Sequence, residues 1–206
     1  MDDDSRNSFV ELTHSLYDEA RSLLAPDKLV LPQNILSHLD THGITHGVYA
    51  WWFDDDLPSV PRDGCISHGD KSLVYVGIAP AKGQRVRAGA LTPMKRRLWR
   101  NHLCGSVRTS TLRLSLASLL KQQLGLSFWR DSSNRVRMNR DHEEVLSNWI
   151  GLHAAVSTMQ HENPQNIERE LIEAGPPFPV NLSMSGHPFR QRLSDLRRSL
   201  GREPTN

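Results

Sequence analysis

The chain has 206 residues, of which 37% are hydrophobic and 23% are charged, so it is suited to one globular domain with short additions. It has no run of about eighteen apolar residues, the length that a membrane span needs. Its acidic start lacks the basic residues of a signal peptide, and its two cysteines show no Cys-x-x-Cys pattern. We therefore expect a cytoplasmic protein with no membrane segment and no zinc–thiolate site.

The charges are distributed unevenly along the chain. Residues 1–70 contain 13 acids and 4 bases, residues 71–130 contain 12 bases and no acid, and residues 131–206 contain 10 acids and 9 bases. Like charges repel one another unless they meet an anion or spread over a solvated face. Nucleic-acid phosphate is such an anion, so the basic segment indicates DNA as a partner and leaves RNA open. A basic helix facing water explains the charges equally well.

The first half of the chain predicts helices followed by strands. Apolar residues recur at helical spacing over 8–25, and Pro32 begins a short helix that ends near Leu39. The composition then changes to β-branched and aromatic residues. This predicts two strands, 47–53 and 72–78, joined by an Asp-, Pro- and Gly-rich loop.

The second half predicts mainly helices, each with a start signal. Thr92-Pro93 begins a basic helix that reaches about Leu103, and Ser110-Thr111 caps an amphipathic helix. Residues 153–157 could prolong a helix or form a third strand, since periodicity does not distinguish the two. The remaining elements are an exposed basic turn or hairpin within 126–140 and helices over 141–151, 163–172 and 188–200.

Four residues can together provide the groups that phosphodiester hydrolysis needs. Such a reaction needs an activated water, an acceptor for its proton and cations that neutralise the developing charge. A carboxylate such as Glu168 binds Mg²⁺ through oxygen. Arg97 offers a planar fork to phosphate oxygens, and the hydroxyls of Tyr49 and Tyr75 can orient water or accept a proton. Each tyrosine, considered alone, is also an ordinary strand aromatic.

These residues resemble the GIY-YIG nuclease family. Gly47-Val48-Tyr49 and Tyr75-Val76-Gly77 are similar to the two halves of the family name, with Val for Ile. Arg97-Leu98 and His102 are similar to the helix that follows. Glu168-Arg169-Glu170-Leu171-Ile172, Pro176-Pro177 and Asn181 are similar to the glutamate helix, the proline turn and the asparagine beyond it.

The resemblance implies a mixed α+β (α/β) fold in which a small three-stranded antiparallel sheet is flanked by helices. It covers a domain over 47–200 with a helical insertion at about 105–150, between an N-terminal helical extension (1–46) and a tail (201–206). It implies one divalent ion, Mg²⁺ or Mn²⁺, held by Glu168.

The resemblance also implies roles for individual residues. Tyr49 would be the general base, Tyr75 would orient the water or phosphate, Arg97 would clamp the phosphate, and His102 would complete the catalytic set. Supporting groups would be Gly47, Gly77, Lys82 and Asn181. Further arginines are expected to bind nucleic acid: Arg85, Arg87, Arg96, Arg100 and Arg113.

The spacing of Arg97 and His102 departs from the family, which has a four-residue gap where this chain has five. On a regular α-helix, five residues place two side chains roughly 140° apart. The sequence leaves three explanations open: the helix frays near His102, Asn101 takes the facing position, or Arg100 is the functional arginine. Arg96 also remains an alternative to Arg97.

Two other functions remain open at this stage. The chain could be a nucleic-acid-binding module that kept the fold without catalysis, in which case binding would be salt-sensitive. It could also present its basic face to an acidic protein partner.

Overall fold

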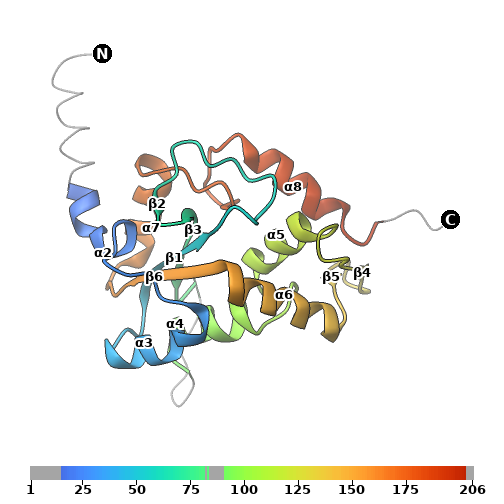
Figure 1. Ribbon diagram of the computed structural model, residues 1–206, viewed down its shortest axis with the longest axis horizontal. Helices are drawn as coiled ribbons and strands as arrows, with labels where there is room; N and C mark the ends of the chain where they lie inside the picture. The colour runs from blue at the N-terminus through green and yellow to red at the C-terminus, as the bar shows by residue number, and fades with distance from the viewer. Residues whose placement is uncertain (1–14, 82, 84–90, 203–206) are drawn as a thin grey trace.

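The computed structural model describes residues 15–81, 83 and 91–202, and its centre is an antiparallel sheet with strand order β2-β3-β1-β6 (Figure 1). The strands are β1 (Gly47–Phe53), β2 (Ser67–His68), β3 (Lys71–Ala79) and β6 (Ala154–Met159). The mixed α+β class is confirmed. One open alternative is decided, and one point of the expectation changes. The undecided segment after residue 153 is a strand, and the sheet has a fourth, two-residue edge strand from the loop before β3.

Helices and one small hairpin surround this sheet. None of the helices among the described residues is long and apolar enough to cross a membrane. The elements are α2 (Arg21–Leu24), η1 (Pro32–Asn34), α3 (Ile35–Thr41), α4 (Pro93–Lys95), η2 (Arg96–Leu103), α5 (Thr111–Leu120), the hairpin β4 (Trp129–Arg130) and β5 (Val136–Arg137), α6 (Arg140–His153), α7 (Pro164–Ala174) and α8 (Phe189–Ser199).

Two helix starts follow directly from side-chain chemistry. The Thr92 side chain accepts a hydrogen bond from the Lys95 N–H, and Pro93 occupies the first helical turn. The Ser110 side chain accepts from the Arg113 N–H at the start of α5. Such caps satisfy backbone donors that have no partner inside the helix. Both predicted starts are therefore confirmed.

The sheet separates two hydrophobic clusters. Tyr49 and Tyr75 lie in the cluster that contains residues of α3, η2, α5, α6 and α8. Val48 and Ala50 lie in the other cluster, with residues of α2 and α7. Every residue of β1 is buried, because both faces of this central strand are covered. The tyrosines consequently belong to a sheltered interior and not to an open sheet surface.

Gly47 begins β1 at a point where the backbone of β6 comes very close. Its φ is +134°, a conformation that residues with a Cβ rarely adopt, and a Cβ added there would collide with the Met159 carbonyl oxygen. β1 and β6 pair from Val48 and Met159 onward. Only glycine therefore allows this register of the two strands.

We expect Gly47→Ala to lower the free energy of unfolding by about 2 kcal/mol or more, because the added methyl group meets backbone that must move. Urea denaturation measures the loss. Gly151→Ala is the matched control, since Gly151 lies in α6 with open space at its Cβ position. That change should leave stability unaltered or raise it by up to about 1 kcal/mol. Equal effects of the two substitutions would contradict the role given to Gly47.

Candidate active site

Tyr49 lies opposite Gly77, and its ring crosses the space that a side chain would fill there. The two residues are cross-strand partners between β1 and β3. A Cβ added to Gly77 would lie 2.5 Å from the Tyr49 hydroxyl oxygen and 3.1 Å from a Tyr75 ring carbon. Because Gly77 has no side chain, the Tyr49 hydroxyl can occupy this position next to β3.

A buried hydrogen-bond cluster forms around this hydroxyl; we call Tyr49, Arg97, His102 and Ser110 the Tyr49 cluster. Arg97 Nε donates to the Tyr49 oxygen at 3.0 Å, and His102 Nε2 lies 2.8 Å from the same oxygen. His102 Nδ1 lies 2.7 Å from Ser110 Oγ. Tyr49, His102 and Ser110 are at most 1% exposed. The cluster links β1, η2 and the start of α5 through polar contacts shielded from water.

The unusual helix η2 resolves the spacing of Arg97 and His102. η2 is a π-helix, and the bond from the Cys104 N–H to the Trp99 carbonyl, 2.8 Å long, spans five residues. A π-helix brings residues five apart onto one face, as an α-helix does for residues four apart. Arg97 and His102 therefore reach one hydroxyl, and none of the three explanations drawn from regular helix geometry was needed.

Burial sets the protonation of the Tyr49 cluster. Desolvation raises the pKa of Tyr49 well above its usual value; the nearby Tyr75 adds to this, and the Arg97 charge opposes it. Desolvation also lowers the pKa of His102 well below its usual value, assisted by the charges of Arg97 and Arg113. The pKa of Arg97 is raised, chiefly by Tyr49. At neutral pH the cluster thus contains a phenol, a neutral imidazole and a guanidinium.

A neutral His102 allows two arrangements of its ring proton. In one, the Tyr49 hydroxyl donates to Nε2, and the Nδ1–H donates to Ser110. In the other, Ser110 donates to Nδ1, and the Nε2–H donates to the Tyr49 oxygen. The first arrangement gives the Tyr49 proton an acceptor in the protein interior, and the second directs two N–H donors at the phenol oxygen.

Tyr75 and Asn181 are arranged around the same strand, β3. The rings of Tyr75 and Tyr49 are stacked, with centroids 6.4 Å apart. The buried Asn181 amide donates to the Val76 carbonyl and accepts from the Val76 N–H, both at 2.9 Å. Asn181 thus satisfies the backbone of β3 between Tyr75 and Gly77, where the two-residue β2 no longer pairs with it.

Glu168 is a partly buried carboxylate on α7. It makes no hydrogen bond or ion pair with any residue of the described ranges. Its charge nevertheless influences the pKa values of Tyr49 and Arg97, although α7 packs against the opposite face of the sheet. Desolvation raises the pKa of Glu168 to about 7, and the Arg97 charge opposes the increase. An unpaired carboxylate in such a place suits an added cation, and Mg²⁺ accepts a single protein carboxylate alongside water and phosphate.

The GIY-YIG catalytic domain matches residues 47–199 of the chain. The chain belongs to the GIY-YIG family. Comparison with curated proteins and with solved structures gave no significant match. GIY-YIG domains are generally found in nucleases, which typically use divalent metal ions, so a nucleic acid is the substrate class that this membership indicates.

A second acidic group of this GIY-YIG protein lies at the other end of β1. Asp54, Asp56 and His153 bring their ligand atoms within 4.8 Å of one another. Lys71 Nζ lies 3.3 Å from Asp54 Oδ2, and His153 Nδ1 lies 3.1 Å from the same oxygen. An internal cation therefore already neutralises Asp54. This group does not include Glu168, and it follows the end of β1 that is remote from Gly47.

Arg113 was predicted to bind nucleic acid, and this prediction is wrong. Its side chain is fully buried, and its guanidinium donates to the His102 and Leu103 carbonyls, to Ser147 Oγ and to Glu143. The bond to Glu143 Oε2 is 2.7 Å long. Arg113 therefore caps the end of η2 and attaches it to α6, and it is not available to a ligand at the surface.

The other predicted basic contacts fall into two groups. Arg96 is partly exposed and Arg100 is exposed on η2, and neither side chain forms a hydrogen bond or ion pair with another described residue. Lys82, Arg85 and Arg87 lie outside the described residues. Ser110 was recognised from the sequence only as a helix cap; its contact with His102 was missed, because no local pattern indicates a contact between separate elements.

The raised pKa of Glu168 predicts a pH-dependent stability. In metal-free protein the folded state holds this proton more tightly than the unfolded chain, because the pKa rises from 4.5 to about 7 on folding. The resulting stability is fully present below about pH 4 and is lost as the pH rises through about 7. We expect Glu168→Gln to be more stable than the wild type by ~1–3 kcal/mol at pH 8 and equally stable near pH 4. Urea titrations in EDTA at both pH values measure this, and a difference independent of pH would contradict it.

Proposed function

We propose that this GIY-YIG protein is a divalent-metal-dependent endonuclease that hydrolyses phosphodiester bonds in DNA. The observation that carries the proposal is the convergence of Arg97 and His102 on the buried Tyr49 hydroxyl, with the unpaired Glu168 carboxylate close enough to influence it electrostatically. Family membership supports a nuclease, and the acid-free segment 71–130 supports a polyanionic substrate.

In this proposal Arg97 has two functions. Its Nε holds the Tyr49 hydroxyl, whereas its two terminal nitrogens make no hydrogen bond to the described residues. Those nitrogens can donate to the non-bridging oxygens of a phosphate, whose charge increases in the transition state. Because the Arg97 guanidinium would contact both the phosphate and the Tyr49 hydroxyl, it would fix the distance between them.

Tyr49 would act as the general base together with His102. The phenol is protonated at neutral pH, because burial raises its pKa, so it must lose its own proton when it accepts one from the attacking water. His102 Nε2, 2.8 Å away, is the group positioned to receive that proton. Ser110 would then accept the Nδ1–H and hold the ring in place. Tyr75, stacked beside Tyr49, would orient the water or the phosphate.

Glu168 would hold Mg²⁺ or Mn²⁺ through a carboxylate oxygen. Such an ion supplies Lewis-acid stabilisation of the phosphate and lowers the pKa of water that it binds. The residues present fit this use, because the Glu168 carboxyl group is partly buried and unpaired within the described part of the chain, and a bound cation would favour its ionised form. The Arg97 charge nearby would help to keep the carboxylate ionised.

Replacing Glu168 tests the proposal most directly. We expect Glu168→Gln to abolish Mg²⁺-dependent plasmid cleavage while DNA binding in EDTA persists, because the amide cannot hold the ion. Glu170→Gln is the matched control, since Glu170 lies exposed on the same helix. Cleavage that survives Glu168→Gln would refute the assigned site. Salt-sensitive binding by the wild type without cleavage under any divalent ion would favour the non-catalytic module instead.

The proton path from Tyr49 to His102 gives a second test. We expect Tyr49→Phe to reduce the cleavage rate at least about hundredfold, because the substitution removes the proton-transferring hydroxyl and keeps the ring. Tyr17→Phe, at an exposed tyrosine, serves as the control. Rates are measured on DNA at saturating Mg²⁺, with unfolding curves to check that both variants are folded. Comparable rates for the two variants would rule out Tyr49 as the base.

A further inference from the structure

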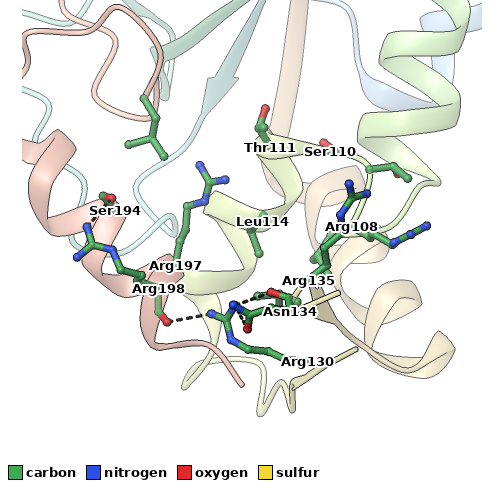
Figure 2. Close-up of a pocket in the computed structure, with 14 residues that line it drawn as sticks. Arg108, Ser110, Thr111, Leu114, Arg130, Asn134, Arg135, Ser194, Arg197 and Arg198 are labelled. Atoms are coloured by element: carbon green, nitrogen blue, oxygen red, sulfur yellow. Dashed lines mark hydrogen bonds between the residues drawn. The ribbon is translucent and has the colours of Figure 1, made fainter. Parts of the chain in front are cut away.

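A pocket of about 520 Å³ lies between the segment that leads into α5, the β4–β5 hairpin and α8 (Figure 2). Figure 2 shows Arg197 and Arg198 of α8 on one side, and Arg108 from the segment before α5 and Arg135 from the hairpin on the other. None of the described residues that line it is acidic. The arginines of its wall are Arg108, Arg130, Arg135, Arg197 and Arg198.

Two of these arginines are committed to the fold. Arg130 donates to the Leu200 and Arg198 carbonyls and to Asn134, so it holds the hairpin against the end of α8. The Arg198 guanidinium lies 3.1 Å from an Asp195 carboxylate oxygen. These contacts shape the pocket. The acceptors of Arg130 are neutral and leave its charge in place, whereas Asp195 offsets part of the charge of Arg198.

The other three arginines have little or no countercharge. Arg108 Nε is 3.8 Å from Asp131, whose carboxylate is closer to Arg137 at 2.8 Å. The side chains of Arg135 and Arg197 form no hydrogen bond or ion pair with the described residues. Arg197 is partly buried, and desolvation lowers its pKa. A partly buried guanidinium without a partner is stabilised by an incoming anion.

The start of α5 adds to the positive potential of the pocket. Ser110 and Thr111 line the pocket at the N-terminus of this ten-residue helix. The Thr111 N–H has no acceptor among the described residues. Unpaired N–H groups and the helix dipole favour an anion at such a position. Guanidinium groups and a helix start thus surround the same space.

The pocket adjoins the Tyr49 cluster. Ser110 belongs to both, since its hydroxyl contacts His102 while the residue lines the pocket. On the other side, Tyr75 of the site lies close enough to Arg197 to influence the pKa of that arginine. An anion in the pocket would therefore lie next to the site proposed for cleavage, within reach of a continuous nucleic-acid strand.

We propose that this pocket binds a backbone phosphate of the nucleic acid other than the one that is cleaved, with Arg135 and Arg197 as its main ligands. The inference rests on the proposed nuclease function. It assigns part of the substrate binding of the protein to the β4–β5 hairpin and α8. Phosphate contacts fix the register of a nucleic acid on a protein without reading its sequence. The pocket would thus set which phosphodiester faces Glu168 and Arg97.

DNA binding in EDTA tests the proposal separately from catalysis. Fluorescence anisotropy with a short fluorescein-labelled duplex would compare wild type with Arg135→Gln, Arg197→Gln and the double variant. The matched control is Arg192→Gln, which removes an exposed arginine of α8 outside this pocket. Arg135 is exposed, so its substitution does not threaten folding.

We expect each pocket substitution to weaken binding severalfold and the double variant to weaken it about tenfold or more. Each lost phosphate contact should reduce the slope of log affinity against log salt by about 1. Arg197→Lys should recover part of the affinity, and Arg192→Gln should change it less than twofold.

Two results would overturn the pocket assignment. One is a double variant that binds DNA with the same affinity and the same salt dependence as the wild type. The other is loss of nucleoside monophosphate binding in the double variant with DNA affinity unchanged, which would assign the pocket to a small phosphorylated ligand. Failure of the nuclease proposal is a different result, namely no cleavage by the wild type with Mg²⁺, and the EDTA binding series can be interpreted in either case.

Discussion

The arrangement of the site depends on keeping one phenol oxygen, that of Tyr49, buried and hydrogen-bonded. A polar group buried without a partner costs a few kcal/mol, so the fold must supply donors or acceptors in the interior. Arg97 and His102 supply them from a single turn of η2, and Ser110 extends the contacts to α5. The central strand, the π-helix and the next helix are thereby fixed relative to one another, which sets the geometry of any chemistry there.

Two glycines make this arrangement possible for steric reasons. Gly77 leaves room for the Tyr49 ring, and Gly47 allows β6 to approach β1. Neither glycine carries a group that could act on a substrate. A side chain at either position would displace a neighbouring ring or strand, because packed interiors leave little room for an extra methyl group. The glycines of the family pattern can therefore be understood as positions of close contact around the tyrosines.

Arginines of this chain serve three different purposes, and burial and countercharge separate them. Arg113 is fully buried and paired with Glu143, so it joins η2 to α6. Arg97 is partly buried and shares its Nε with Tyr49. Arg197 is partly buried without a partner among the described residues. The arginines of this chain thus do not form a uniform surface, and their number overstates the positive charge that a polyanion can reach.

The sequence alone determined the elements and the order of the motif residues, because caps, periodicity and strand composition are local properties. It indicated the starts of the helices after Thr92 and Ser110, both long strands, and Tyr49, Arg97 and Glu168 as candidates. Only the tertiary structure decided what these residues meet. The π-helical turn that joins Arg97 and His102, the burial of Arg113 and the contact from Ser110 to His102 depend on packing between elements far apart in the chain. A local pattern holds no information on such contacts, because hydrogen-bond partners and desolvation are set by neighbours in space.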